Sequence, residues 1–218
     1  HEHRRQRQMC IRDRLITAFF LIIGCGSETP EAGALVSVKK IPEITVNDYI
    51  YTLGEVTIKW TAFKHSAKAQ VGGKFKSAEV KGFTESTNLS NAISGVTFKI
   101  PVASTSTNDE GRDYKIVNSF FNTMVDTDSI SGRILSIDEN GSGKLVINMN
   151  GQEVEKQYKW EMDQTNKEIY LKTSIDVLNW GAQSSLDALN EVCLEQHTGP
   201  DGKNVLWPNV DITVIVDL

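Results

Sequence analysis

The sequence predicts a mainly β protein, a single eight-stranded antiparallel barrel with two short helices inserted into its connections. Segments in which apolar and polar residues alternate recur along most of the chain, and this period of two is typical of a strand with one buried side. Asn140-Gly141 and Asn150-Gly151 are strong markers of hairpin turns. Because a long antiparallel sheet must close or stack to cover its edges, we expect a barrel.

The clearest strands flank a short polar connection near the start of the sheet. The first is expected over residues 55–63, with one apolar face: Val56, Ile58, Trp60 and Ala62. The second is expected over residues 69–81, with Val71, Gly73 and Phe75 on one face and lysines opposite. Whether the apolar face packs solid or surrounds a ligand is the central functional question.

The same alternation predicts the other strands. They are expected at residues 35–39, 44–46, 94–104, 129–138, 143–150, 152–162, 168–177 and 211–218. Pro101 lacks a backbone donor, so an edge or a bulge is expected at its position. Residues 83–92 are expected to form a polar loop or short turn. The last strand, rich in β-branched residues, is expected to pair with the opening hairpin and complete the closure.

Two helices are expected between the strands. The first lies within residues 108–124 and gives way to an extended run. Asn108 or Asp109 can cap it, and acidic residues suit its N-terminus. The second covers residues 178–196, where apolar side chains recur at spacings of three and four: Leu186, Leu189, Val192 and Cys193.

The N-terminal segments read as an export signal. Residues 1–14 resemble an artefact more than a natural start, or alternatively a basic n-region. Residues 15–24 contain an apolar run that is shorter than the ~20 residues needed to span a bilayer and suits a signal peptide. The run ends before Cys25 in a pattern that resembles a bacterial lipobox, so lipidation of Cys25 and stable anchoring are expected. The alternative is a secretory peptide with an incidental cysteine.

The segment after the expected cleavage site is a tether. Residues 25–43 begin with the lipidated Cys25 and continue through small, polar and acidic residues, which favour flexibility. No Asp follows Cys25, and by resemblance to Gram-negative lipoproteins this favours the outer membrane. The folded domain is therefore expected at residues 44–218. Its expected location is the periplasmic side of the outer membrane or the cell surface.

Composition argues against several classes of function. A net charge of -5 and a pI near 5.4 disfavour nucleic acid as a partner, and the sequence contains no phosphate-binding or zinc-protease motif. With Cys25 lipidated, Cys193 leaves no disulfide framework. Cys193 and His197 would form at most half a metal site, so we expect a buried apolar cysteine and no metal.

Three motifs together resemble the YceI-like family of bacterial lipid-binding proteins. They are TIKWTAFK…VGGKF, STSTNDEGRDYKIVNSFF and LNWGAQSSLDALNEVC…H…DG…W…VDITV, and the resemblance covers about residues 48–218. The middle motif is the most specific, although Lys115 stands where the family usually has His. Trp60 stands where Phe is usual. The pattern of Trp60, Lys64 and Gly72-Gly73 resembles the lipoprotein branch of Bacteroidetes-like bacteria.

The resemblance implies a lipocalin-like barrel with a long apolar channel for a polyisoprenoid chain, such as an isoprenoid quinone. No cofactor is expected beyond such a bound lipid, and a homodimer is compatible with this interpretation. The expected channel walls are the inward apolar residues, each of which could instead be simple core: Val56, Ile58, Trp60, Phe75, Phe98, Ile100, Phe120, Phe121, Ile134, Ile147, Trp160 and Leu171.

Two other classes of function stay open at this point. A structural or interaction module with a filled barrel would use residues 83–92 and 197–207 as contact surfaces. An enzyme is poorly supported, because no triad, paired-carboxylate or metal spacing stands out. Arg112 and Asp113 are adjacent on a capped helix, where such a pair more often fixes the fold than transfers protons. The expected function is therefore non-catalytic lipid binding.

Overall fold

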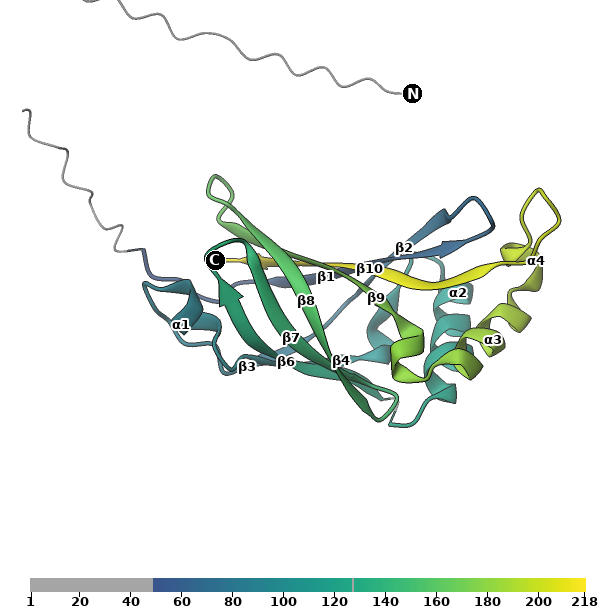
Figure 1. Cartoon of the computed structure of the whole chain (residues 1–218), viewed down its shortest axis with the longest axis horizontal. Coiled ribbons are helices and arrows are strands. Elements are labelled where there is room, and N and C mark those ends of the chain that lie inside the picture. The colour runs from purple at the N-terminus through teal and green to yellow at the C-terminus, as the bar shows by residue number, and fades with distance from the viewer. Residues whose placement is uncertain (1–48, 127) are drawn as a thin grey trace, which may run out of the picture. The chain divides into compact units, whose positions relative to one another are not determined.

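The computed structural model describes residues 49–126 and 128–218. The proposed signal, Cys25, the tether and the strands expected at 35–39 and 44–46 lie outside these residues. The described chain forms one curled antiparallel sheet in the order β3-β4-β6-β7-β8-β9-β10-β1-β2-β5 (Figure 1). Its strands are β1 (Val56–Lys64), β2 (Ala69–Phe75), β3 (Glu79–Lys81), β4 (Thr97–Pro101), β5 (Thr105–Ser106), β6 (Ser129–Asp138), β7 (Ser142–Met149), β8 (Gln152–Asp163), β9 (Glu168–Asp176) and β10 (Leu206–Asp217).

The mainly β, antiparallel fold is confirmed, but the described chain has ten strands instead of eight. Two expected strands are each interrupted. The strand expected over residues 69–81 divides into β2 and β3, and the one expected over 94–104 becomes β4 followed by a 3-10 turn, η1 (Val102–Ser104). Pro101 is the last residue of β4, so its missing N–H falls where the chain leaves the strand.

The pairing places the last strand beside the first. β10 runs antiparallel to β1, with Val216 opposite Val56, as the sequence predicted. On its other side β1 pairs with β2. β3 and β5 are the two edge strands of the sheet. In the sequence β3 follows β2, which lies at the β5 edge, and β5 follows β4, which lies at the β3 edge. Beside η1, the Lys76 N–H donates to the Ser104 carbonyl oxygen at 2.8 Å.

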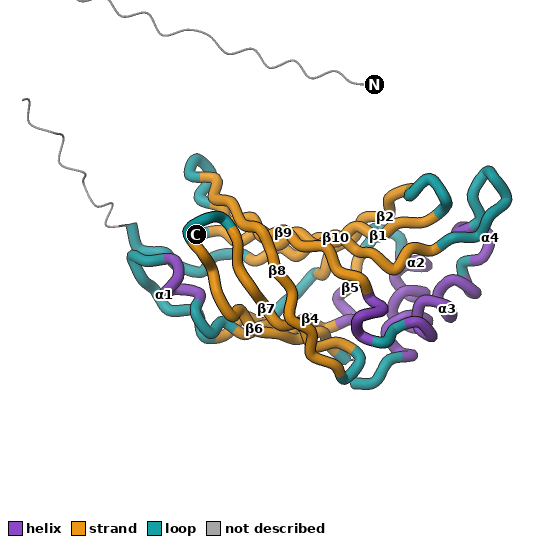
Figure 2. The backbone as a smooth tube through the Cα atoms, in the orientation of Figure 1, coloured by secondary structure: helices purple, strands orange, loops and turns teal. Residues whose placement is uncertain are grey.

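Short helices lie at both ends of the curled sheet (Figure 2). The helices are α1 (Leu89–Ile93), α2 (Glu110–Lys115), α3 (Gln183–Val192) and α4 (Leu194–His197), with a π turn η2 (Ile116–Phe120) and 3-10 turns η3 (Phe121–Thr123) and η4 (Val177–Trp180). The expected pair of helices is therefore replaced by several shorter ones. None of the helices in the described part of the chain combines the length and the apolar character needed to cross a bilayer.

Helix α1 differs from the sequence analysis, which expected a polar loop or short turn over residues 83–92. Asn88 caps α1, because its side-chain oxygen accepts from the Asn91 N–H at 3.0 Å. Ala92, within α1, is fully buried. A helix of one turn has too few residues to display a helical period, so local pattern alone could not reveal it.

A buried cluster lies where η4 meets the sheet and includes Val177, Trp180 and Ala182. Trp180 is fully buried, and its indole N–H donates to the Ile147 carbonyl oxygen at 3.0 Å. The Asn150 side chain donates to the Trp180 carbonyl oxygen at 2.7 Å. Gly181 ends η4 with a positive φ of 65°, a conformation that favours glycine. This core lies at the end of the sheet that carries η4 and α3.

Candidate functional site

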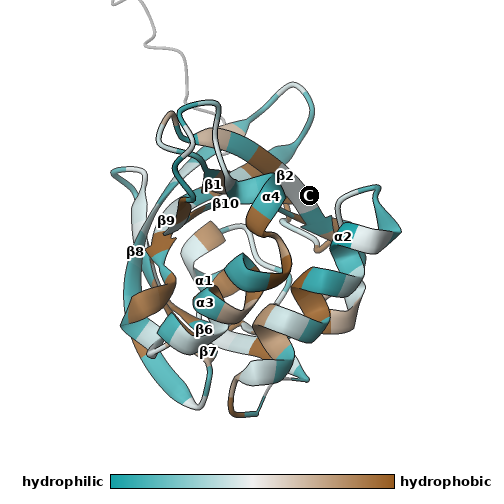
Figure 3. Ribbon diagram, turned by 90° about the vertical axis from the view of Figure 1, so that its right-hand side faces the viewer, coloured by the Kyte–Doolittle hydropathy of each residue, from teal (hydrophilic) through white to brown (hydrophobic). Residues whose placement is uncertain are grey.

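The concave face of the sheet encloses an elongated apolar cavity of about 280 Å³. This volume is close to the lower end of the ~300–1,000 Å³ range of small-molecule sites. Viewed end on, the strands surround a central region, and α3 and α4 lie across the near end (Figure 3). Side chains from both ends of β10, Leu206 and Val216, line the same cavity. The cavity therefore follows the length of the strands.

The polar atoms of the lining residues are turned toward the backbone. The Tyr158 hydroxyl donates to the Ser136 carbonyl oxygen at 2.7 Å, and the Thr173 hydroxyl donates to the carbonyl oxygen of Gln157 at 2.8 Å. In the same way the Trp207 indole N–H donates to a backbone carbonyl, that of His65, at 2.8 Å. These bonds leave mainly hydrocarbon facing the cavity.

Trp60 is the exception among these side chains. Its Nε1 is buried and has no hydrogen-bond partner among the described residues. A buried donor without a partner costs about 1–3 kcal/mol. No hydrogen bond therefore fixes the orientation of this indole, and its position depends on packing alone.

The structure brings eleven of the twelve expected wall residues into one lining, consisting of Val56, Ile58, Trp60, Phe75, Phe98, Ile100, Phe120, Phe121, Ile134, Ile147 and Leu171. Trp160 is not among the lining residues, which corrects the sequence analysis. Its indole N–H instead donates to the Asp138 carbonyl oxygen at 2.9 Å. Alternation places Trp160 on the correct face of β8 but does not reveal the direction of its long side chain.

Sequence reasoning missed many of the remaining lining residues. Some lie on β9 and β10, where the same alternation could have identified them. Others come from helices and connections, for which apolar periodicity predicts burial but no particular neighbour. Examples of both kinds are Leu53, Phe83, Ile93, Ile116, Ile175, Leu186, Leu189 and Trp207.

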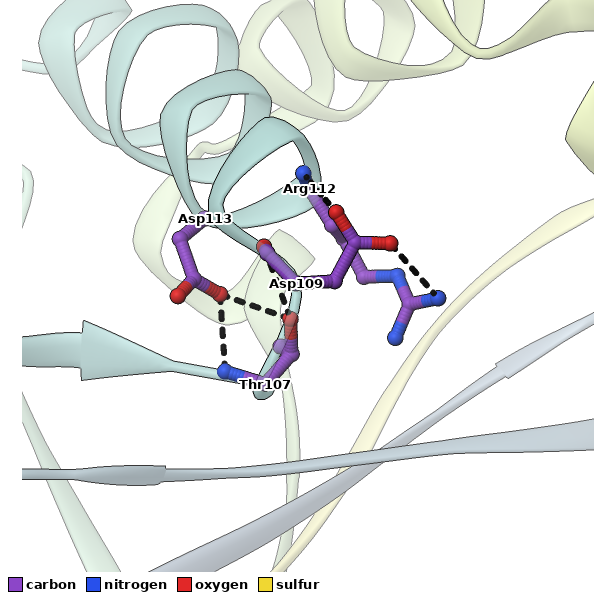
Figure 4. Close-up of polar contacts among 4 residues, drawn as sticks. All are labelled: Thr107, Asp109, Arg112 and Asp113. Carbon is purple, nitrogen blue, oxygen red and sulfur yellow. Dashed lines mark hydrogen bonds and ion pairs between the residues drawn. The ribbon is translucent and has the colours of Figure 1, made fainter.

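A polar cluster positions the helical part of the lining (Figure 4). The Asp113 carboxylate accepts from the Thr107 N–H at 2.7 Å and from the Thr107 hydroxyl at 2.6 Å. Asp109 caps α2 by accepting from the Arg112 N–H at 3.0 Å, and its carboxylate also forms an ion pair with the guanidinium at 3.4 Å. Arg112 and Asp113 thus have separate partners, and both stabilise the segment that leads into Ile116.

His197 lies in a second polar cluster, at the end of α4. Its Nδ1 is 2.8 Å from the Asn190 side-chain oxygen, and the Asn190 amide donates to Asn204. Burial, followed by the charges of Lys64, His65 and Lys115, lowers the pKa of His197 to about 4. The imidazole is therefore neutral near pH 7, which makes its Nδ1–H the donor to Asn190.

Cys193 is buried, as the sequence predicted. In the described ranges, no group of three or more His, Cys, Asp or Glu side chains is arranged to hold a metal ion.

Comparison with known proteins identifies the domain. The sequence profile of the YceI-like domain matches residues 38–216. A polyisoprenoid-binding domain from Saccharophagus degradans, implicated in plant cell wall breakdown, is similar in structure, with a TM-score of 0.52 at 10% identity over 74% of this chain and 91% of that chain. BcnA from Burkholderia cenocepacia has a TM-score of 0.50 at 10% identity, covering 74% and 94%. No curated protein matches the chain. The chain belongs to the YceI-like domain family.

Proposed function

We propose that this protein binds an isoprenoid or similar amphiphilic lipid without chemical change, with the apolar chain inside the cavity. The observation that carries the proposal is the lining itself, in which the hydroxyls of Tyr158 and Thr173 and the indole N–H of Trp207 donate to backbone carbonyls. Each methylene group transferred from water to such a wall contributes about 0.8 kcal/mol. A long chain therefore needs few polar contacts for tight binding.

The dimensions of the cavity favour an extended chain over a compact ligand. Leu206 and Val216 both line it, and the intervening stretch of β10 covers about 33 Å at ~3.3 Å per residue. A volume of about 280 Å³ distributed along such a length is narrow. The name of the Saccharophagus degradans domain, which describes polyisoprenoid binding, supports the same ligand class.

We also propose that the ten strands act as an eight-strand wall around the ligand. β2 and β3 would serve as one bent strand, and β4 and β5 as its bent neighbour. In support, β3 pairs with β4, β2 pairs with β5, and the Lys76 N–H to Ser104 oxygen bond lies between these pairings. Such a wall would keep water from the chain along its length.

Lipidation at Cys25 would fit this function. A protein held at a membrane surface by its own acyl chains could exchange a hydrophobic cargo with that membrane. On this proposal the domain lies at the outer membrane, on the periplasmic side or at the cell surface. Mass spectrometry of the mature protein, expressed with its N-terminal segment in a Gram-negative host, would test the anchor; a Cys25→Ser variant is the control.

The alternative of an interaction module with a filled barrel has less support. Its expected contact segments, 83–92 and 197–207, are fully described and contain none of the large apolar residues that are exposed elsewhere. The cavity also argues against a filled interior. We therefore retain lipid binding as the conclusion.

The test is to extract purified protein with organic solvent and to identify bound lipid by mass spectrometry. Two adjacent residues of β1 give a matched pair of variants: Ala62 lines the cavity, and Thr61 points to the opposite face. Ala62→Phe should reduce the recovered lipid, and Thr61→Phe should not. Wild-type protein that carries no lipid and takes up none from vesicles would overturn the proposal.

A further inference from the structure

Three aromatic residues of the cavity lining lie directly opposite glycines on neighbouring strands. The cross-strand partners are Trp60 and Gly73, Phe98 and Gly132, and Tyr158 and Gly143. A Cβ added at Gly73 would lie 2.2 Å from the Trp60 ring, one at Gly132 would lie 2.4 Å from the Phe98 ring, and one at Gly143 would lie 2.3 Å from the Tyr158 ring. Each ring therefore covers its glycine and lies along the wall.

Gly73 differs from the other two glycines in what surrounds it. At Gly132 and Gly143 an added Cβ would also meet backbone oxygens, at 2.1 Å and 2.5 Å, so the main chain itself requires glycine there. At Gly73 the three nearest atoms all belong to the Trp60 indole. Its φ is not positive, so the backbone conformation alone would accept another residue. The absence of a side chain at Gly73 thus makes room for one ring, the Trp60 indole. We call this space the Gly73 seat.

The indole that covers Gly73 is held in place by packing and not by a hydrogen bond to the described residues. Trp60 Nε1 has no hydrogen-bond partner within residues 49–126 and 128–218, so moving the ring breaks no hydrogen bond with this part of the chain. Tyr158, by contrast, is tied to Ser136 by its hydroxyl. The backbone of β2 lies behind the seat, so a ring that leaves Gly73 must move toward the cavity. Trp60 lies between Ile58 and Ala62 in the lining of β1, so the displaced ring would divide the cavity.

We propose that Trp60 and Gly73 form a pair that determines ligand length: the Gly73 seat keeps the cavity continuous, so that one extended chain can pass Trp60. This inference rests on the proposed lipid-binding function and adds a specificity-determining position to it. The ligand class that follows is a single chain long enough to occupy the cavity on both sides of the indole. A short chain occupies the cavity on only one side of the indole, so its binding does not depend on the Gly73 seat.

The experiment compares isoprenols of increasing length, namely geraniol, farnesol and geranylgeraniol, by displacement of a fluorescent apolar probe from the full chain. Gly73→Ala should weaken geranylgeraniol binding by at least about tenfold, the loss expected when about two methylene groups no longer bind. Geraniol binding should change by less than about twofold, well under half of that free energy. The double variant Gly73→Ala/Trp60→Leu should recover long-chain binding, because it removes the displaced ring.

Gly72 supplies the matched control. It is adjacent to Gly73 on the opposite face, and a Cβ there would have only one neighbour, the Trp60 carbonyl oxygen at 3.9 Å. Gly72→Ala should leave the whole isoprenol series unchanged. Each variant is checked by circular dichroism and thermal unfolding.

Several results would overturn the inference. They are an equal loss for all chain lengths, folded Gly73→Ala with wild-type binding, or a double variant that recovers nothing. If Gly73→Ala does not fold, the double variant should fold and bind the isoprenols as Trp60→Leu alone does. If Gly73→Ala and the double variant both fail to fold, the added methyl group clashes with something other than the indole. Wild-type protein that binds no isoprenol would instead refute the proposed function itself.

Discussion

Asp113 holds Thr107 through two hydrogen bonds to one carboxylate oxygen, from the backbone N–H at 2.7 Å and from the hydroxyl at 2.6 Å. The contact joins the start of α2 to the residue that follows β5. Hydrogen bonds to charged groups contribute more than neutral ones, because the charge strengthens the interaction. The lining residues Ile116 and Phe120 lie on η2, which directly follows α2.

Asp113→Ala is expected to lower the free energy of unfolding by about 2–3 kcal/mol, because it leaves the part-buried Thr107 donors without their acceptor. Denaturant unfolding followed by circular dichroism measures this change. Asp109→Ala, which removes an exposed helix cap, should cost only about 1 kcal/mol. A smaller effect at Asp113 than at Asp109 would contradict the role assigned to the Thr107 contact.

Two tryptophans should respond differently to replacement by phenylalanine. Trp180→Phe removes the bond to the Ile147 carbonyl oxygen and leaves a cavity, so it should cost about 2–4 kcal/mol. Trp60→Phe removes a buried donor that has no partner in the described part of the chain, so the loss of packing is largely offset and the change should stay within about 1 kcal/mol. Equilibrium unfolding of both variants gives the comparison. Equal losses would contradict the expected difference between the two indoles.

Tyr158 should make the protein sensitive to alkali. The pKa of its phenol is raised well above the ordinary value, mainly by burial and secondly by the negative charge of Asp138. Above about pH 10 the unfolded chain loses this proton while the folded chain keeps it. The folded state then binds more protons, so stability should fall as pH rises.

Tyr158→Phe provides the comparison for this pH dependence. The variant should flatten the alkaline slope and cost about 1 kcal/mol near pH 7 through loss of the Ser136 bond. Unfolding measured from pH 8 to pH 11 tests both effects. A slope identical to that of wild type would exclude Tyr158 as its source.

His197 should produce the opposite dependence in acid. Its pKa is lowered to about 4 in the folded protein, whereas an unperturbed histidine titrates near 6.5. Between these values the unfolded state binds the extra proton, so stability should be complete above about pH 6.5 and should fall as pH drops toward 4, by roughly 1–3 kcal/mol. NMR titration of the imidazole measures its pKa directly.

His197→Gln serves as the control for this acid dependence, because an amide can still bond Asn190 but does not titrate over this range. The slope between pH 7 and pH 4 should be shallower in the variant. A His197 resonance that titrates near pH 6.5 in the folded protein would contradict the burial-driven shift.

Much of the sheet could be predicted because its signals are local. Alternation placed the wall residues of β1 correctly, and the two Asn-Gly turns mark hairpins with positive φ at Asn150, Gly141 and Gly151. The division of β2 from β3 could not be predicted in this way. β2 pairs with β5 and β3 pairs with β4, and the change of partner falls near Ser104. The choice of partner depends on residues far away in the sequence.

The cavity itself was only partly predictable. An apolar strand face looks the same in sequence whether it packs solid or surrounds a space, and only the family resemblance favoured a space. The seat at Gly73 depends on its cross-strand register with Trp60. Register follows from the whole sheet and cannot be read from either strand alone. Trp160 is opposite Leu171 and packs against the core cluster, but it does not line the cavity.

The pairing of β1 with β10 has a consequence for biogenesis. Val56 and Val216 are opposite each other, so this strand pair joins segments from the two ends of the domain. Contacts this distant in sequence slow folding, because the chain must close a very large loop before they can form. While a ribosome still holds the C-terminal strand, β1 and β9 each lack one of their two neighbours, so the sheet is completed only after synthesis ends.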